Sequence, residues 1–227
     1  MIDCRVMVQA RMSSTRFPGK VLAPLCGQPL IAHVLSRICE AVPRERVILV
    51  TSEGATDDPL ASYVGNALGV TVFRGSLDDV VWRFQACLRA HPCEWFVRIC
   101  GDSPAIDPGL LGWMLERVSD DLDLLTNVAK RTFPPGESIE IVRVRTFLGW
   151  KPDELTPEER EHVTLHFYRH SERYRIRNVY ATETTLSGRR LVVDTLDDLR
   201  AIERILATDP HSTRGYAAHA RLGPLPV

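Results

Sequence analysis

An apolar run passes directly into a basic, polar loop in the stretch Arg5-Val6-Met7-Val8-Gln9-Ala10-Arg11-Met12-Ser13-Ser14-Thr15-Arg16-Phe17-Pro18-Gly19-Lys20. The run 5–10 has the continuous apolar character of a strand that is covered on both faces of a sheet. Comparable runs recur at 47–51, 70–73, 95–99, 122–125 and 191–194, and patterns typical of helix starts lie between them. This alternation predicts an α/β fold with an open, mostly parallel sheet, whose ligands bind beyond the carboxyl ends of the strands.

Composition limits the class of protein further. The chain has 227 residues, of which 44% are hydrophobic and 25% charged, as in ordinary globular proteins. This length predicts a single domain over 1–227. The 28 Lys and Arg residues are balanced by 29 Asp and Glu residues, for a net charge of -1. No overall positive field is therefore available to hold a nucleic acid or an anionic membrane.

The spacing of the cysteines and the length of the apolar runs indicate where in the cell the protein is located. The six cysteines contain no Cys-x-x-Cys pair, which disfavours a zinc knuckle or a redox motif. No run approaches the roughly 18 apolar residues of a membrane span, and the N-terminus lacks the pattern of a signal peptide. These features predict a cytoplasmic protein that binds neither a membrane nor a nucleic acid.

Residues 127–187 break the alternation of strands and helices. A Pro134-Pro135-Gly136 turn precedes a strand-like run at 138–144, a helix that Thr156 would cap, and a second strand-like run at 174–180. We expect this segment to be an insertion that contacts a second subunit or an acceptor substrate. A further helix, capped by Thr195, is expected to end near Thr208.

The loop after the first strand has the composition of a phosphate site. Arg11, Arg16 and Lys20 supply positive charge, while Ser13 and Ser14 are small enough to let backbone N–H groups face an anion. It is not a Walker A loop, because Ser14 occupies the position of the first glycine and valine follows the lysine in place of Ser or Thr. The alternative interpretation is an exposed basic turn without a ligand.

Two carboxylates follow predicted strands. Asp102 lies just beyond 95–99, and Asp194 ends the run 191–194. At adjacent strand ends, such a pair can hold Mg²⁺ while phosphate oxygens and waters complete its coordination. Taken singly, each aspartate is better explained as an N-cap or turn residue, and Asp194 could simply start the helix at Thr195. Taken with the phosphate loop, the magnesium site is the better explanation.

The predicted strand 70–73 ends next to a polar turn, Arg74-Gly75-Ser76. Ser76 and Asp79 form a capping-box pattern, so Ser76 is expected to be the N-cap of the following helix. Arg74 would contact a base or a phosphate, or else form a surface ion pair with Asp78 or Asp79.

Five sequence blocks occur in order along nearly the whole chain. They are Gln9-Ala10-Arg11 with Ser13-Ser14-Thr15-Arg16 and Pro18-Gly19-Lys20, Arg74-Gly75-Ser76 with Asp78-Asp79-Val80, Gly101-Asp102-Ser103-Pro104, Arg160-Glu161-His162-Val163-Thr164, and Val193-Asp194-Thr195. The first resembles the signature of the cytidylyltransferases that make CMP-sugar acids, the acylneuraminate and KDO group. Together the blocks most resemble the spore-coat-polysaccharide branch of that group.

The resemblance implies a three-layer, Rossmann-like nucleotidyltransferase fold, CTP as donor, Mg²⁺ bound by Asp102 and Asp194, and a homodimer formed through 127–187. It also implies in-line attack of an acceptor oxygen on the α-phosphorus of CTP, with release of pyrophosphate. Arg11 and Lys20 would meet the phosphates, and Arg16 the triphosphate or the acceptor. The other nucleotide-binding candidates are Gln9, Ala10, Met12, Ser13, Ser14, Arg74, Ser76 and Gly101.

The acceptor side is less determined. Glu140, Glu161 and His162 are candidates for binding the acceptor or a second subunit. His162, expected in the second turn of a helix, is equally explained as a packed structural histidine. Ser138 stands where the spore-coat branch leads us to expect aspartate, so a sugar acid, a phosphosugar and a phosphonate all stay open as acceptors.

Three other functions are compatible with parts of the sequence. A glycosyltransferase that uses a nucleotide sugar would commonly present an Asp-x-Asp pair, whereas this chain has Asp102-Ser103-Pro104. A sugar-phosphate nucleotidyltransferase could use UTP, GTP or ATP on the same fold. A non-catalytic nucleotide-binding subunit would not need both aspartates and the loop lysine.

Overall fold

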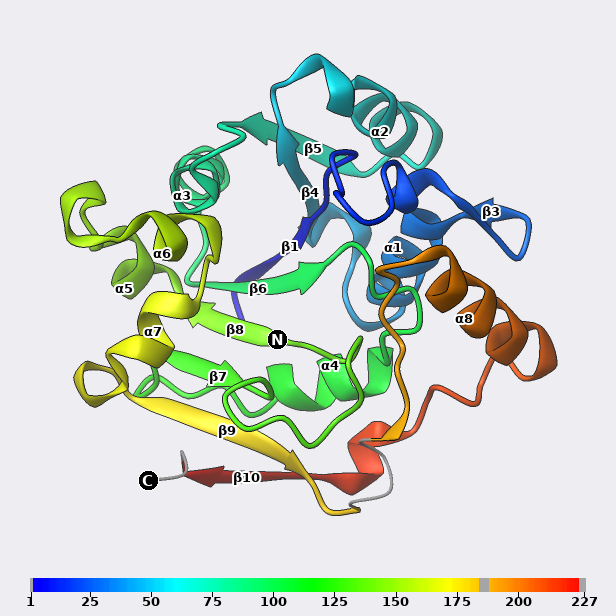
Figure 1. The fold of residues 1–227 in the computed structure, drawn as a ribbon. Coiled ribbons are helices and arrows are strands. Elements are labelled where there is room, and N and C mark those ends of the chain that lie inside the picture. The colour runs from blue at the N-terminus through cyan, green and yellow to red at the C-terminus, as the bar shows by residue number, and fades with distance from the viewer. Residues whose placement is uncertain (1, 184–187, 225–227) are drawn as a thin grey trace.

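One mixed sheet forms the centre of the computed structural model, which describes residues 2–183 and 188–224. The strand order is β10-β9-β7-β8-β6-β1-β4-β5 (Figure 1). The strands are β1 (Cys4–Gln9), β4 (Val47–Ser52), β5 (Thr71–Gly75), β6 (Trp95–Cys100), β7 (Leu124–Thr126), β8 (Glu140–Arg143), β9 (Ile176–Ala181) and β10 (Ala220–Pro224). A separate two-stranded ribbon pairs β2 (Pro24–Leu25) with β3 (Gln28–Pro29).

Most strands of this sheet run in one direction. β1 pairs in parallel with β4 and β6, β4 pairs in parallel with β5, and β7 pairs in parallel with β9. β8 is antiparallel to both β6 and β7, and β10 is antiparallel to β9. The mostly parallel sheet expected from the sequence is therefore confirmed.

Helices cover both faces of the sheet, as Figure 1 shows. One face carries α1 (Leu30–Ala41), α4 (Pro108–Leu115) and α8 (Leu196–Thr208), and the other carries α3 (Val80–Ala90), α5 (Val144–Leu148), α6 (Pro157–Glu161) and α7 (Leu165–Arg169). A short α2 (Asp58–Ser62) follows β4 and continues into a π-helical turn, η4 (Tyr63–Ala67). The short 3-10 turns are η1 (Lys20–Leu22), η2 (Arg44–Arg46), η3 (Ala55–Asp57), η5 (Pro152–Glu154), η6 (Ser171–Arg173) and η8 (Tyr216–His219).

The continuous apolar strands have a direct structural reason. Along β1, Val6 and Val8 pack into the core beneath α1 and α4, while Met7 between them packs into the second core beneath α3 and α5. Successive side chains of a strand point to opposite faces, so a sheet covered on both sides needs apolar residues at every position. This arrangement leaves the ends of the strands as the place where polar side chains collect.

The prediction of a strand at 191–194 was wrong. Leu191 and Val193 are fully buried, as the apolar pattern required. Their backbone N–H groups, however, donate to loop carbonyls, Leu191 to Pro135 at 2.6 Å and Val193 to Asp102 at 2.9 Å. The segment is thus a buried connection held across the ends of other elements, with no place in the sheet.

Two predictions about helix ends were also wrong. The N-cap of α3 is Asp79, whose carboxylate accepts from Trp82 N–H at 2.8 Å, while Ser76 Oγ accepts from Asp79 N–H at 3.1 Å one turn earlier. Ser76 and Asp79 each accept a hydrogen bond from the backbone three residues later, so they form two consecutive turns and not one capping box. His162 is the C-cap of α6 and does not lie in its second turn. The expected capping boxes at Thr156 and Thr195 are both present.

Residues 127–183, the described part of the predicted segment 127–187, contribute to the main sheet, and 184–187 lie outside the described residues. β8 lies between β6 and β7, and β9 pairs with β7 on the other side. The strand-like runs at 138–144 and 174–180 correspond to these two strands. The sheet therefore continues through the segment that was expected to interrupt it, and the role of this segment in a dimer stays a prediction. No helix within the described part of the chain combines the length and the apolar content needed to cross a membrane.

Candidate active site

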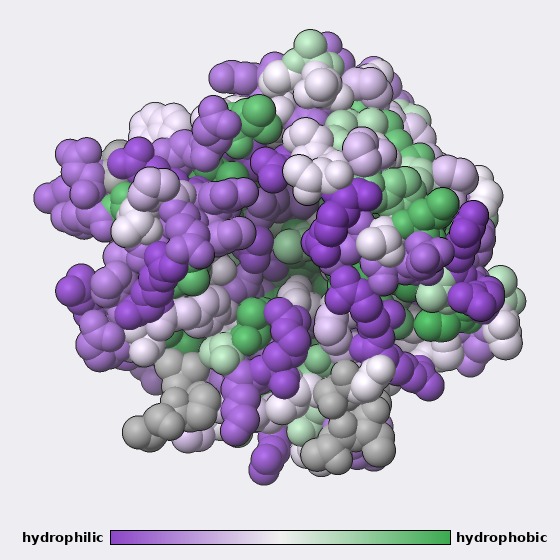
Figure 2. Space-filling view, in the orientation of Figure 1, coloured by the Kyte–Doolittle hydropathy of each residue, from purple (hydrophilic) through white to green (hydrophobic). Residues whose placement is uncertain are grey.

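A cavity of about 360 Å³ lies where β1 and β6 end side by side. Figure 2 shows the hollow near the middle of this face, with mostly hydrophilic side chains around it. Its volume falls within the range of pockets that bind small molecules. The lining residues are Gln9, Ala10, Arg11, Ser13, Ser14, Thr15, Arg16, Lys20, Val21, Arg83, Cys100, Gly101, Asp102, His162 and Asp194.

Backbone hydrogen bonds give the loop after β1 its shape. The carbonyl of Met12 accepts from the N–H groups of Ser14 and Gly19, both at 2.9 Å. Gly19 has a φ of 75°, a left-handed conformation that favours glycine and that turns the chain into η1 at Lys20. The loop is thereby closed on itself, with the basic and hydroxyl side chains predicted to bind phosphate facing the cavity.

A buried carboxylate that the sequence analysis missed anchors this loop. Asp57 is fully buried and accepts from Met12 N–H at 2.7 Å, while its other oxygen accepts from the hydroxyl groups of Thr51 and Ser52. Burial alone would raise the pKa of Asp57, but the hydrogen bonds from Met12, Ser52 and Thr51 outweigh it and lower the pKa. The carboxylate thus ties the loop to the end of β4.

Lys20 lies between the two aspartates predicted to bind metal. Its Nζ donates to Asp102 Oδ2 at 2.8 Å, to Asp194 Oδ1 at 3.2 Å and to the carbonyl of Val193 at 2.7 Å. The side chain of Lys20 is 10% exposed, so this ammonium is shielded by the loop and by the strand ends. The structure therefore brings together three predicted residues that are far apart in the sequence.

Two arginines add positive charge beside Asp194. Arg16 Nη2 lies 2.9 Å from Asp194 Oδ1, and Arg190 Nη2 lies 2.6 Å from Asp194 Oδ2. Arg190 also contacts Asp198 at 3.0 Å, which connects this group to the first turn of α8. With Lys20, three cationic side chains contact the single carboxylate of Asp194. This side of the cavity is well suited to an anion as well as to a metal.

The two aspartates fit a magnesium ion by their donor chemistry. Mg²⁺ in nucleotide sites is usually bound by one or two carboxylates, with waters and substrate phosphates as the remaining ligands. The side chains of Asp102 and Asp194 are partly exposed, at 24% and 18%, and both line the cavity. An incoming cation would compete with the Lys20 ammonium for the same carboxylate oxygens, so a polyphosphate that attracts Lys20 would favour metal binding.

Gly101 allows β1 and β6 to approach closely at the floor of the cavity. A Cβ atom at this position would lie 2.6 Å from Ala10 Cβ and 3.2 Å from the carbonyl oxygen of Gln9. Gly101 N–H donates to that same carbonyl at 2.8 Å. The expected glycine in the block before Asp102 is thus required by backbone packing, and it places Asp102 directly beside the loop.

A second residue missed from the sequence, Arg83, also lines the cavity. It comes from α3, is 1% exposed, and donates through Nη1 to the carbonyl of Ser76 at 2.6 Å, while Nε has no hydrogen-bond partner among the described residues. Burial, together with repulsion from Arg11, lowers the pKa of Arg83 to about 10. Arg83 lies three residues after Val80 and next to Phe84, so the helical spacing of apolar residues indicated that it lies on the buried face of α3.

Glu140 supports the cavity from behind. Its carboxylate is 2% exposed and contacts Arg98 Nη1 at 2.6 Å, while Arg98 Nε donates to the side-chain oxygen of Gln9 at 3.0 Å. Thr164 and Tyr168 also donate to Glu140 Oε1, at 2.6 and 2.5 Å. Glu140 therefore does not reach the cavity as an acceptor ligand would, and instead orients Gln9 through Arg98.

The other predicted site residues divide between the cavity and its surroundings. Arg74 does not line it, because its guanidinium pairs with Asp58 at 2.6 Å and donates to the carbonyls of Ser52 and Gly54. The ion pair expected with Asp78 or Asp79 is wrong, since the partner is Asp58, and contact of Arg74 with a nucleotide stays a prediction. Ser76 and Met12 also lie outside the lining set.

The rim opposite the loop is formed by the end of α6. His162 lines the cavity, and the exposed carboxylate of Glu161 lies 3.8 Å from Arg11 Nη2. This ion pair is exposed on both sides and contributes little to stability. The predicted acceptor-side residues Glu161 and His162 are therefore close to the predicted nucleotide side.

A mostly parallel sheet with a basic loop and Asp102 at its strand ends, where the buried connection brings Asp194 beside them, places the chain among α/β nucleotidyltransferases. The chain belongs to the cytidylyltransferase family, whose model, described as "Cytidylyltransferase", matches residues 5–222. It is similar to the spore coat polysaccharide biosynthesis protein SpsF of Bacillus subtilis, at 32% identity over 90% of this chain and 87% of that protein.

Two further relatives agree with this assignment. The structure of a cytidylyltransferase from Leptospira borgpetersenii superimposes with a TM-score of 0.87 at 29% identity, covering 96% of this chain and 92% of that one. The 3-deoxy-manno-octulosonate cytidylyltransferase of Mesorhizobium japonicum is 33% identical over 51% of this chain and 48% of its own length. The resemblance inferred from the five sequence blocks is thus confirmed.

Proposed function

We propose that the chain transfers CMP from CTP to a sugar acid or a related small anionic acceptor, in a Mg²⁺-dependent reaction that releases pyrophosphate. The observation that carries this proposal is the position of Lys20, which joins the phosphate loop to both Asp102 and Asp194 at the floor of the cavity. The names of the relatives from B. subtilis and M. japonicum support polysaccharide biosynthesis as the setting and a sugar acid as the acceptor.

The reaction balances as a single displacement at phosphorus. An acceptor oxygen forms a bond to the α-phosphorus of CTP while the bond from that phosphorus to the bridging oxygen breaks, and pyrophosphate leaves with the bonding electrons. If the acceptor oxygen is a hydroxyl, its proton passes to solvent or to a nearby base; if it is already an ionised phosphate or phosphonate oxygen, no base is needed. Bound Mg²⁺ would neutralise charge on the phosphates.

The residues of the chain supply positioning and charge. Arg11, Lys20 and the buried Arg83 surround the loop side of the cavity and would bind the triphosphate and the departing pyrophosphate. Arg16 and Arg190, which contact Asp194, would meet an anionic group on the acceptor side. Asp102 and Asp194 would hold the metal between these two sides.

A pyrophosphate-release screen tests the proposal. Purified protein is supplied with CTP, UTP, GTP or ATP, with Mg²⁺, and with a panel of sugar acids, phosphosugars and phosphonates. We expect release with CTP and an anionic acceptor. Release with another nucleotide alone would favour the sugar-phosphate enzyme, and free nucleoside diphosphate from a nucleotide sugar would favour the glycosyltransferase. Binding without turnover on any acceptor would favour the regulatory subunit.

Two variants connect this activity to the residues. Lys20→Ala should lower turnover severely while the protein stays folded, and near-normal pyrophosphate release would refute the loop assignment. Asp102→Asn should abolish activity or alter its Mg²⁺ requirement, and an unchanged metal titration would refute the role of that carboxylate.

A homodimer formed through 127–187 and a cytoplasmic location belong to the same proposal. The homodimer is supported by the family resemblance of the sequence blocks, and the location by the cysteine spacing of the sequence. Light scattering at micromolar protein concentration tests the assembly: a mass of two chains is expected, and a monomer would refute the dimer.

A further inference from the structure

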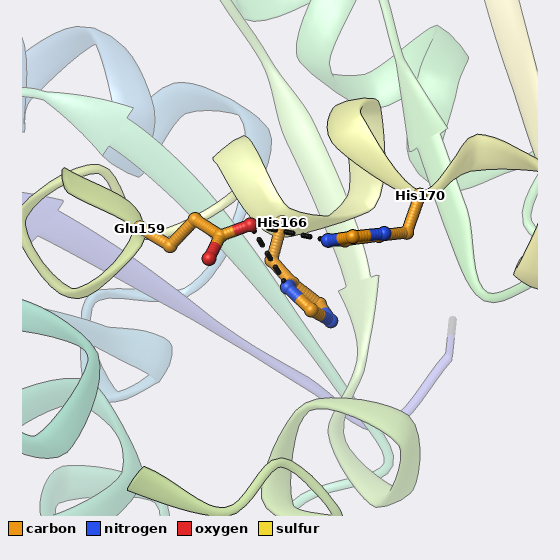
Figure 3. Close-up of side chains that lie close together, drawn as sticks. All are labelled: Glu159, His166 and His170. Carbon is orange, nitrogen blue, oxygen red and sulfur yellow. Dashed lines mark hydrogen bonds and ion pairs between the residues drawn. The ribbon is translucent and has the colours of Figure 1, made fainter. Parts of the chain in front are cut away.

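Three potential metal ligands converge outside the cavity, between α6 and α7. Glu159 Oε1 lies 3.1 Å from His166 Nδ1 and 3.4 Å from His170 Nε2. Figure 3 shows both imidazole rings directing a nitrogen toward the carboxylate. The three atoms all lie within 4.8 Å of one another. One carboxylate oxygen and two imidazole nitrogens are thus close enough to share a single ion.

The two separations from Glu159 Oε1 match the ligand spacing in the coordination shell of a transition metal, and the two histidine nitrogens lie within 4.8 Å of each other. Zinc bonds to imidazole nitrogen and carboxylate oxygen are about 2.0–2.2 Å long, so the edges of a tetrahedron around it are about 3.3–3.5 Å. The measured separations of 3.1 and 3.4 Å are close to such edges. We propose that Glu159, His166 and His170 bind one Zn²⁺-like divalent ion, with water as the fourth ligand.

Two of the ligands are already fixed in position by their neighbours. Glu159 Oε2 accepts from the N–H and the hydroxyl of Thr156, at 2.8 and 2.9 Å, so Oε1 is directed to the histidines. Burial would raise the pKa of Glu159, but the bonds from Thr156 and His166 outweigh it and bring the pKa to about 2. The ring of His166 packs edge-on against Trp150 at a centroid distance of 4.8 Å. Glu159 and His166 are thus oriented before any ion binds.

The third ligand provides access from solvent. The side chain of His170 is 33% exposed, whereas those of His166 and Glu159 are 7% and 2% exposed. An ion and its water would therefore enter from the side of His170. A closed shell of four protein ligands is typical of structural zinc, and three protein ligands with one water leave an exchangeable position.

The ligand types distinguish this site from the cavity. Imidazole suits Zn²⁺, Co²⁺, Ni²⁺ and Cu²⁺, whereas Mg²⁺ prefers oxygen ligands in an octahedron. Mg²⁺ should therefore bind at Asp102 and Asp194 without occupying the histidine site. Binding of an ion at the histidine site is therefore independent of the proposed reaction.

A bound ion would connect α6 to α7. Glu159 lies in α6, which ends at Glu161 and His162 on the rim of the cavity, while His166 and His170 lie in α7 and at its C-cap. Joining these helices through metal bonds would fix that rim without any contact with substrate. The ion would therefore act on how α6 and α7 are held together, and protein stability is the appropriate readout.

Cobalt titration of the full chain, after removal of metals with a chelator, tests the proposal. We expect one equivalent of Co²⁺ to give the visible absorption bands of a tetrahedral ion, and Zn²⁺ to displace it. At about a hundred times the dissociation constant, Zn²⁺ should raise Tm by about 5–10 °C, and Mg²⁺ should leave this shift unchanged.

Matched variants assign the signal to these residues. His170→Ala removes the exposed ligand and should abolish both the cobalt bands and the Zn²⁺-dependent rise in Tm, whereas His211→Ala, which removes an exposed histidine that is not one of the three ligands, should retain them. Asp102→Asn should also retain them, which separates this site from the cavity. Equal Co²⁺ binding by native protein and His170→Ala would overturn the proposal. So would the absence of tetrahedral bands in the native protein, which would leave the three residues as a hydrogen-bonded group.

Discussion

Replacing Lys20 with methionine keeps an unbranched side chain of similar length and removes the ammonium that contacts Asp102 at 2.8 Å and Asp194 at 3.2 Å. In the native chain a divalent cation bound at the proposed site would compete with this ammonium for the two carboxylates. We therefore expect Lys20→Met to bind Mg²⁺ more tightly in the absence of nucleotide. Turnover should nevertheless fall, because the loop has lost the ammonium that we propose binds the phosphates.

The size of both effects follows from the contacts. A hydrogen bond to a charged group contributes about 1.5–3 kcal/mol net, and 1.4 kcal/mol corresponds to a tenfold change in affinity. Relief from one such bond gives roughly 10- to 100-fold tighter Mg²⁺ binding. Loss of one preorganised donor to developing charge costs about 10²–10³ in kcat. Affinity for the metal and rate should thus change in opposite directions.

Calorimetric titration of Mg²⁺ into nucleotide-free protein measures the first effect, and pyrophosphate release measures the second. Lys151→Met is the matched control, since Lys151 is 77% exposed and lies 3.9 Å from Glu154, away from the cavity. This control should change neither quantity. If Lys20→Met and native protein bind Mg²⁺ with the same affinity, the competition between lysine and metal is refuted.

Three further predictions concern the supports of the cavity. Asp57→Ala should lower the free energy of unfolding by about 2–4 kcal/mol, because buried donors lose their acceptor. Since the pKa of Asp57 is lowered by folding, this difference should be present above about pH 4 and shrink as pH falls further, as measured by urea unfolding across pH. Gly101→Ala should lower the free energy of unfolding by about 1–3 kcal/mol, because the new Cβ clashes with Ala10. The control Gly112→Ala places its Cβ where nothing lies within 4 Å, so it should raise the free energy of unfolding by about 0.5–1 kcal/mol. Equal shifts in Tm for the two variants would contradict this. Arg83→Met should weaken CTP binding about tenfold or more in a calorimetric titration, and unchanged affinity would exclude a phosphate contact.

The sequence was sufficient to predict the sheet, because burial on both faces leaves a strong apolar signal in β1, β4 and β6. It was misleading at 191–194, where Leu191 and Val193 are as apolar as strand residues. What differs is where their backbone N–H groups donate, which depends on loops more than fifty residues away. Hydrophobicity reports burial and does not report the hydrogen-bond partner.

Site residues could be predicted from the sequence where a charged side chain lies in a loop after a strand. They could not be predicted where the charged side chain lies within a helix or a strand. Arg11, Lys20, Asp102 and Asp194 lie in loops or just past strand ends, so their types and places were informative. Arg83 lies within a helix, where its place on the apolar face beside Phe84 indicates burial but does not indicate that its guanidinium lines a cavity. Asp57 and Glu140 act through other residues, and a supporting role of that kind leaves no pattern along the chain.

The hydrogen bond from Val193 N–H to the carbonyl of Asp102 affects how the cavity forms while the protein itself is being synthesised. A chain emerging from the ribosome forms its N-terminal part first, and that part already contains the loop and Asp102. Asp194 arrives only when the segment before α8 has docked against the end of β6. A chain interrupted before that point would carry a basic loop with one carboxylate, so truncated products would lack the assembled cavity.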